Sequence, residues 1–244
     1  MNMSVSVCIA TYNGRDYIEQ QLSTILEQLD LGDEVVVVDD ASSDATLDLV
    51  RAFNDPRIRI VENERNLGHV ASFSRALALA RHEVLIMADQ DDIWLPQRVR
   101  LMVAGLEAPH CLVLASNSEF MHGSGINMIY QCEGVTSASS NEFAANIWSI
   151  FMGRRRYYGC AMALRREFCK VILPIPAYVE SHDLWIAMAG NMARGNVHVD
   201  ASTLIRRVHG NNASIVSRPI IRKLWSRLIF VISYVDLWMR LLRA

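Results

Sequence analysis

Five continuous apolar runs alternate with helix-like stretches in the first half of the chain, and this order restricts the fold more than any other feature. The runs lie at residues 5–10, 34–40, 58–61, 83–89 and 111–116. Because Val, Ile and Leu follow one another without regular polar gaps, the runs predict strands that are covered on both faces. A strand–helix–strand order with short connections predicts an α/β fold with a doubly wound, mostly parallel sheet.

Polar and acidic side chains follow three of these runs at the point where each strand should end. They are Thr11–Gly14 after the first run, Asp39 and Asp40 at the end of the second, and Asp89–Asp92 after the fourth. In a doubly wound sheet, ligands bind outside the carboxyl ends of the strands. We therefore expect these three segments to meet at one rim.

The segment Asp89–Asp92 places three carboxylates within four positions. Like charges at this spacing repel one another, which raises their pKa values unless a cation is present. Carboxylate oxygens are ligands suited to Mg²⁺ or Mn²⁺, and such a cation could hold a diphosphate. The usual glycine-rich dinucleotide and P-loop patterns are absent from the sequence. The plainer interpretation is that Asp92, before Pro96, starts a helix and that Asp44 caps another.

Charge is divided unevenly along the chain. The formal net charge is −2, but residues 218–244 carry six basic side chains and one acidic one, so they hold +5 and the rest −7. An acidic body argues against nucleic acid as a partner. The basic, apolar tail predicts an amphipathic helix, which could lie on a membrane surface or pack on this domain or on a second copy.

The cysteines and the first residues indicate a cytoplasmic location. The five cysteines are scattered, odd in number and without a C-x-x-C pair, so we expect reduced thiols and no structural zinc. The opening residues lack the pattern of a signal peptide, and no apolar run is long enough for a spanning helix. The tail could still hold the protein at the inner face of the cell membrane.

Several motifs in a fixed order give the chain a family resemblance. With CIATYNGRDYIEQQL, VVVVDDASSDAT and MADQDDIWLP, followed by NERNLG, GCAMALRREF, SHDLW and RVHGNNAS, it resembles the family-two inverting glycosyltransferases of the GT-A fold. The resemblance covers roughly residues 3–215. DQDDIW together with HDLW and HGNN looks most like the bacterial rhamnosyltransferase-like branch, which builds surface polysaccharides.

The resemblance implies a nucleotide site at the first strands. Thr11, Tyr12 and Asn13 would line the nucleotide pocket, and Asp40 would accept a hydrogen bond from the ring N–H of uracil or thymine. Asn66 would form a turn near the base, although an ordinary loop would look the same. Asp89 would lie near the ribose as well as the metal.

A metal site and a catalytic base are also implied. Asp89 and Asp91 would match the D-x-D motif, with Asp91 as the direct metal ligand, and His209 is a further candidate contact for the metal or diphosphate. Asp183 would match the catalytic base, and His182 is a second candidate because many relatives carry Glu there. The competing interpretations are that Asp183 caps the following helix and that His209 lies in a solvent-facing loop.

The expected activity is that of an inverting, metal-dependent glycosyltransferase, a hexosyltransferase. The donor would be a UDP- or dTDP-sugar, with dTDP-rhamnose as one candidate, and the acceptor a hydroxyl of a glycan or lipid-linked sugar. Residues 1–217 would form the catalytic domain, divided into a nucleotide-sugar half (1–116) and an acceptor half (117–217), with a helical tail at 218–244. The alternatives are a sugar-nucleotide pyrophosphorylase-like nucleotidyltransferase and an inactive carbohydrate-binding scaffold.

Overall fold

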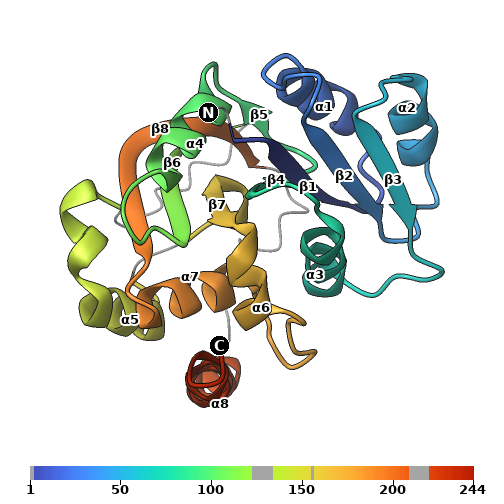
Figure 1. Cartoon of the computed structure of the whole chain (residues 1–244). Coiled ribbons are helices and arrows are strands. Elements are labelled where there is room, and N and C mark those ends of the chain that lie inside the picture. The colour runs from blue at the N-terminus through green and yellow to red at the C-terminus, as the bar shows by residue number, and fades with distance from the viewer. Residues whose placement is uncertain (1–2, 123–133, 155–156, 209–219) are drawn as a thin grey trace.

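The computed structural model describes residues 3–122, 134–154, 157–208 and 220–244 (Figure 1). Its strands are β1 (Val5–Thr11), β2 (Glu34–Asp39), β3 (Ile58–Glu62), β4 (Val84–Asp89), β5 (Ile93–Trp94), β6 (Val113–His122), β7 (Met162–Arg165) and β8 (Asn196–Val208). Its helices are α1 (Ile18–Leu26), α2 (Thr46–Ala52), α3 (His69–Leu79), α4 (Arg98–Leu106), α5 (Phe143–Met152), α6 (Cys169–Ile172), α7 (His182–Met192) and α8 (Ile220–Leu241). Short 3-10 turns lie at η1 (Ser137–Asn141), η2 (Gly159–Ala161) and η3 (Arg166–Phe168).

The strands form one mixed sheet in the order β3-β2-β1-β4-β7-β6-β8-β5. The first four are parallel, as expected from the continuous apolar runs, and Thr11 pairs with Asp39 while Ala10 pairs with Asp89. This register brings the carboxyl ends of β1, β2 and β4 together. The predicted α/β sheet is confirmed.

The short strand β7 lies between β4 and β6 and is antiparallel to both. Its four residues are too short a run to stand out in the sequence as a strand. The second half of the sheet is therefore mixed, because β6 pairs in parallel with β8 while β5 pairs antiparallel with it. This half places β8 close to the end of β4.

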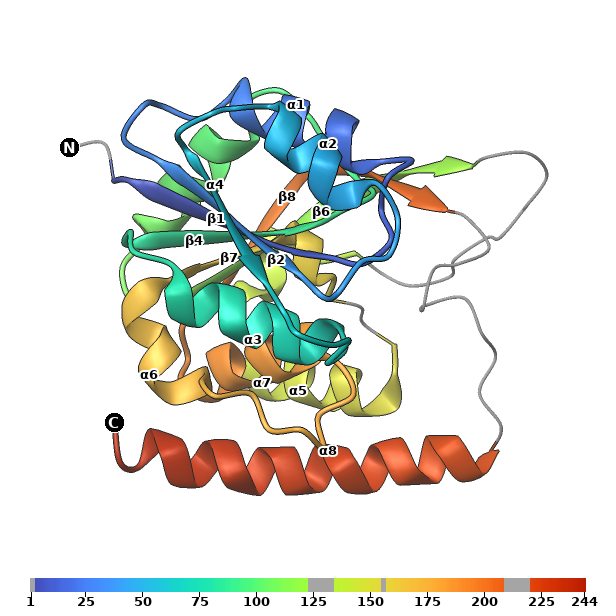
Figure 2. The same cartoon turned by 90° about the vertical axis from the view of Figure 1, so that its right-hand side faces the viewer.

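Helices cover both faces of the sheet (Figure 2). One face packs against α1, α2 and α4, and the other against α3, α5, α6 and α7. Neighbouring residues of β1 alternate between the two cores: Val7 and Ile9 pack on the α1 side, and Cys8 packs on the α3 side. All three are fully buried, which explains why β1 shows no polar alternation.

The long helix α8 lies outside the second helical layer, beside α6 and α7 (Figure 2). Of its described side chains, Leu237 is fully buried against that layer. In the part of the chain that the structure describes, no helix has both the length and the apolar content needed to cross a bilayer.

Candidate active site

The turns after β1 and β4 are joined through Gln90. The Tyr12 N–H donates to Gln90 Oε1 at 2.9 Å, and Gln90 Nε2 donates back to the Tyr12 carbonyl at 3.1 Å. Gly14 lies so close that a Cβ there would be 2.3 Å from Gln90 Oε1, so only glycine fits without rearrangement. The Tyr12 side chain remains half exposed, at the rim where the sequence predicted a nucleotide pocket.

The carboxylate of Asp39 holds the β1 and β2 ends together. Thr11 Oγ1 donates to Asp39 Oδ1 at 2.9 Å, and the N–H and hydroxyl of Ser42 donate to the same carboxylate at 2.8 and 2.6 Å. Asn13 adds a second link, because the Ser43 N–H donates to Asn13 Oδ1 at 2.8 Å. Thr11 is therefore buried beneath the rim, whereas Asn13 lies on its exposed side.

Asp40 is buried beside the loop that leads into α3. Asn63 Nδ2 and the Leu67 N–H donate to its Oδ1 at 2.7 and 2.8 Å, and the Gly68 N–H donates to Oδ2 at 2.8 Å. Burial alone would raise the pKa of Asp40, but these hydrogen bonds outweigh it and lower the pKa. The Ser72 hydroxyl also lowers this pKa, so protein donors from the α3 side keep the Asp40 carboxylate ionised.

Asn66 belongs to the same loop. Its side chain is exposed, and Asn66 Oδ1 accepts the Gly68 N–H at 3.2 Å. Gly68 has φ +88°, a conformation that favours glycine and that directs its N–H toward Asp40 and Asn66. The predicted turn is present.

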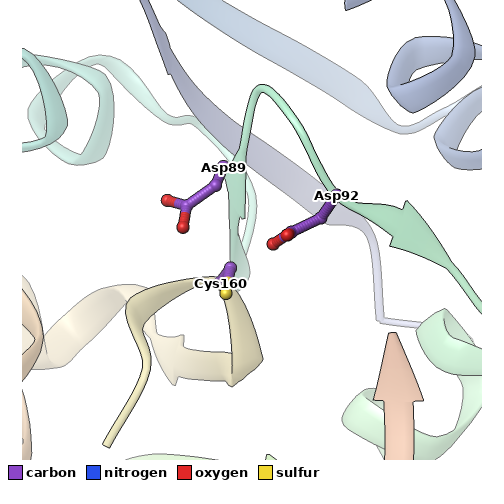
Figure 3. A group of neighbouring side chains, drawn as sticks. All are labelled: Asp89, Asp92 and Cys160. Atoms are coloured by element: carbon purple, nitrogen blue, oxygen red, sulfur yellow. The ribbon is translucent and has the colours of Figure 1, made fainter. Parts of the chain in front are cut away.

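The acidic segment after β4 contributes to a group of three possible metal ligands. One ligand atom each from Asp89, Asp92 and Cys160 lies within 4.8 Å of the others (Figure 3). Cys160 comes from η2, and both Asp92 and Cys160 are buried. Asp91 is partly buried next to this group and is not one of its three members.

The carboxyl groups of this cluster carry unusual electrostatics. Burial and the neighbouring Asp91 raise the pKa of Asp89, while burial and the charge of Asp89 raise the pKa of Asp92 well above its ordinary value. Asp92 Oδ2 is buried without a hydrogen-bond partner among the described residues. The interpretation that Asp92 starts a helix is wrong, because strand β5 follows it directly and α4 begins only at Arg98. An acceptor atom with no donor fits a site for a cation.

Two arginines that the sequence analysis did not identify flank the cluster. Arg206 of β8 places its Nη2 3.9 Å from Asp89 Oδ2, and its guanidinium lies over the Tyr158 ring at 4.0 Å. Arg98 of α4 is fully buried and donates to the carbonyls of Cys160 and Met87. Burial lowers the pKa of Arg98 to about 10. The only signal in the sequence was the basic pair 206–207 inside a strand-like run.

Arg206 should compete with a bound cation, because its charge already faces Asp89. Replacing Arg206 by Gln should tighten Mn²⁺ binding without nucleotide by about tenfold, since two unit charges near 4 Å interact strongly at a protein surface. Electron paramagnetic resonance of free Mn²⁺ would measure this. Arg207→Gln is the matched control, because the Arg207 guanidinium lies over Tyr17 instead. Weaker Mn²⁺ binding by the Arg206 variant would contradict this prediction.

Asp183 lies in the first turn of α7 and is partly buried. Its Oδ1 accepts hydrogen bonds from the Ser181 hydroxyl and, at 2.8 Å, from the Leu184 N–H. Burial raises the pKa of Asp183 to about 6, and the charge of Asp89 adds to this, while the Leu184 N–H and Arg206 oppose it. A carboxylate with such a pKa can accept a proton near neutral pH.

His182 points into the protein instead. Its ring stacks on Phe73 with centroids 4.2 Å apart, and neither ring nitrogen has a hydrogen-bond partner among the described residues. Burial lowers the pKa of His182 to about 3. Gly159 leaves space for this ring, because a Cβ there would lie 2.6 Å from His182 Nε2. A neutral, enclosed imidazole is a poorer proton acceptor than the Asp183 carboxylate. The other histidine that the sequence predicted at the site, His209, lies outside the described residues.

Comparison with known proteins shows the family of the chain. A model of the family described as "Glycosyl transferase family 2" matches residues 6–172. The succinoglycan biosynthesis protein ExoO of Rhizobium meliloti is 33% identical over 131 residues, or 53% of this chain and 38% of that protein. WfgD of Escherichia coli, a UDP-Glc:alpha-D-GlcNAc-diphosphoundecaprenol beta-1,3-glucosyltransferase, is 31% identical over 120 residues, or 49% and 45%. The chain spans less than half the length of these curated relatives.

Solved structures share the fold. Residues 1–349 of Staphylococcus aureus TarS in complex with UDP-GlcNAc match with a TM-score of 0.71 and 22% identity, covering 93% of this chain and 65% of that one. The mannosyltransferase PcManGT of Pyrobaculum calidifontis, in complex with GDP-Man and Mn²⁺, matches with a TM-score of 0.65 and 19% identity, covering 100% and 75%. These likenesses confirm the predicted GT-A-type α/β fold.

Proposed function

Because the chain belongs to glycosyl transferase family 2, we propose that it moves a sugar from a nucleoside-diphosphate donor to a hydroxyl of a glycan or lipid-linked acceptor, with inversion. The observation that carries this proposal is the joint position of the acidic cluster and Asp183. The charge of Asp89 influences the pKa of Asp183, so the two groups share one electrostatic environment. One can hold a leaving diphosphate through a cation while the other accepts a proton.

Asp183 is the base in this proposal. Its carboxylate would take the proton of the acceptor hydroxyl while that oxygen forms a bond to the anomeric carbon. The bond from the anomeric carbon to the diphosphate oxygen breaks at the same time, and the nucleoside diphosphate leaves from the opposite face. One displacement inverts the anomeric carbon, and its transition state has oxocarbenium character. His182 is the lesser candidate because it is buried and neutral.

The residues at the end of β4 fit a divalent cation. Asp89 and Asp91 would hold Mg²⁺ or Mn²⁺ as a D-x-D pair, and the unpartnered Oδ2 of Asp92 offers a further oxygen. The Cys160 sulfur is a soft ligand, which suits Zn²⁺ or Cu⁺ better than Mg²⁺ or Mn²⁺, so the carboxylates are the expected ligands. The cation would supply positive charge to the leaving diphosphate. His209 remains a predicted additional contact.

Asp40 would recognise the nucleotide base of the donor, and Thr11, Tyr12, Asn13 and Asn66 would surround that base. The lowered pKa keeps Asp40 ionised, and an ionised carboxylate is an acceptor that suits the ring N–H that uracil and thymine share. WfgD is named for a UDP-Glc donor, and the TarS structure is a complex with UDP-GlcNAc. A UDP-sugar is therefore the first donor to test. A dTDP-sugar, including dTDP-rhamnose and the rhamnosyltransferase-like assignment, is the finer alternative.

The wider setting is part of the same proposal. ExoO is named for succinoglycan biosynthesis and WfgD for a diphosphoundecaprenol-linked substrate. We infer a role in cell-surface polysaccharide synthesis at the cytoplasmic side of the membrane. Residues 1–116 would bind the donor, residues 117–217 the acceptor, and residues 218–244 would form a basic, amphipathic helical tail.

A thermal-shift screen of nucleoside diphosphates tests the proposal. UDP or dTDP with Mn²⁺ should raise Tm, because a ligand that binds only the folded state at about 100 times its Kd adds about 2.7 kcal/mol of stability. For a chain of this size that corresponds to roughly 5–10 °C. Two controls, GDP with Mn²⁺ and UDP without Mn²⁺, should give smaller increases in Tm. No response to any nucleotide would contradict the proposal.

A further inference from the structure

The helix α8 packs on the protein through Leu237, Phe230 and Leu241, but most of its large apolar side chains lie on the face that points away from the protein. These side chains are 41–69% exposed: Leu224, Trp225, Leu228, Val231, Ile232, Tyr234, Val235, Trp238, Met239 and, just beyond the helix, Leu242. Spacings of three and four residues put most of them on one side of the helix. A contiguous exposed apolar surface of this kind marks a site of interaction.

The polar side chains of α8 hold this orientation in place. Ser226 Oγ donates to Glu180 Oε2 at 2.8 Å, and the Tyr178 hydroxyl donates to Asp236 Oδ2 at 2.7 Å. Arg240, which donates to Asp236 Oδ1 within α8 at 3.0 Å, also donates to the carbonyl oxygens of Val171 in α6 and of Pro174 after it. Its guanidinium lies over the Trp185 ring at 5.1 Å. Rotating the helix to bury its apolar face would break these contacts, so the apolar face stays outward.

The apolar surface continues from α8 onto α5. A cavity of about 290 Å³ lies between the two helices and is lined by Trp148 and Phe151 of α5 and by Phe230 and Tyr234 of α8. Trp148 is 58% exposed. We define the docking surface as the exposed apolar face of α8 together with Trp148.

Charge decides between two occupants of the docking surface. In a symmetric contact between copies each α8 would face the other, which would bring together two tail segments of +5 each. Anionic lipid head groups instead complement this charge. Between residues 224 and 242 the charged side chains are Arg227, Asp236 and Arg240. Arg227 lies over the Phe151 ring at 5.0 Å, and the other two pair with each other.

We propose that the docking surface inserts into the interface of an anionic lipid bilayer, with α8 lying in the membrane plane. Its 22 residues make a helix about 33 Å long. Tryptophan and tyrosine prefer the membrane–water interface. The docking surface contains four such side chains: Trp148, Trp225, Tyr234 and Trp238. This contact concerns a surface on the far side of α6 and α7 from the sheet and is separate from the catalytic chemistry (Figure 2).

The orientation has a consequence that rests on the proposed function. Figure 2 shows α8 extending along one side of the molecule, with its first residues toward the end where the site strands finish. A bilayer on that side would place the rim of the site near the membrane surface. A lipid-linked acceptor held in the same bilayer would then reach the site without leaving the membrane.

Vesicle co-sedimentation of the full chain tests the proposal without donor or acceptor. The protein should bind vesicles of phosphatidylcholine with phosphatidylglycerol, bind phosphatidylcholine alone more weakly, and show blue-shifted tryptophan emission when bound. The double variant Leu228→Glu, Val235→Glu should lower the partition coefficient by about tenfold or more. Leu31→Glu is the matched control, because Leu31 is 91% exposed but lies on the α1–β2 connection.

Other outcomes would overturn the lipid assignment. Equal vesicle binding by the double variant and the parent protein would do so. So would a dimer in sedimentation velocity, without lipid, that the double variant abolishes, because the docking surface would then join two copies. Circular dichroism and the UDP thermal shift should be unchanged in the double variant, which separates this result from a failure of folding or of the proposed function.

Discussion

Replacing Asp183 by Asn should lower kcat by about 10²–10⁴-fold, the usual contribution of a general base. Asparagine has nearly the same shape, and its Oδ1 can still accept the Leu184 N–H that Asp183 accepts at 2.8 Å. It cannot take a proton from the acceptor hydroxyl. UDP release from a panel of UDP-sugars with a glycan acceptor measures kcat, and calorimetry should show unchanged binding of UDP.

The pH profile separates a base from a helix cap. The pKa of Asp183 is raised to about 6, so the carboxyl is protonated and inactive as a base below that pH. The rate should rise about tenfold per pH unit up to pH 6 and level off above it. Asp48→Asn, at an exposed side chain of α2, is the matched control. If Asp183→Asn kept the kcat of the parent protein and the same pH profile, Asp183 would only cap α7.

Replacing Asp91 by Asn should abolish the Mn²⁺-dependent part of UDP binding and lower kcat/KM by at least about 100-fold, or about 2.7 kcal/mol. The reason is that a neutral amide neither attracts the cation nor balances its charge as a carboxylate does. Thermal shift by UDP with and without Mn²⁺ measures the binding effect independently of activity. Asp89→Asn should act in the same direction, because the Asp89 carboxylate is itself one of the possible ligands in the cluster.

Cys160→Ser is the informative control for this series. The thiol belongs to the same group of possible ligands but is fully buried and has a raised pKa. If carboxylates hold the cation, the serine variant should keep the Mn²⁺ response within about twofold. The opposite result would be loss of the Mn²⁺ response in Cys160→Ser and its retention in Asp91→Asn. That result would show that the metal binds at the buried Asp92 and Cys160 and not at the D-x-D pair.

The first half of the fold was predictable because its signals are local. A continuous apolar run such as 35–38 is buried on both faces, so each residue in it must be apolar regardless of its neighbours elsewhere. The rim followed from the same logic, since Thr11 and Asp39 pair in register at the ends of parallel strands. The strand β7 was not predicted, because a run of four residues is too short to show the apolar pattern of a strand.

The interior of the site was less predictable. In the sequence, Asp92 lies four residues before Pro96 and looks like an ordinary helix start, and only the approach of η2 makes it a buried carboxylate beside Cys160. Arg206 reaches Asp89 from β8, more than a hundred residues away. His182 became the weaker base because Phe73 and Gly159 enclose it, and neither is near it in the sequence.

The sequence by itself determined the parallel half of the sheet, the acidic rim and the amphipathic character of the tail, because each depends on spacing within a short segment. Only the tertiary structure decided which face of α8 turns outward. The same helix could bury either face. Its polar side chains find partners in Glu180 and Tyr178, which hold the apolar side toward the surroundings. Burial and charge at a site depend on contacts between distant segments, and these exist only once the chain has folded.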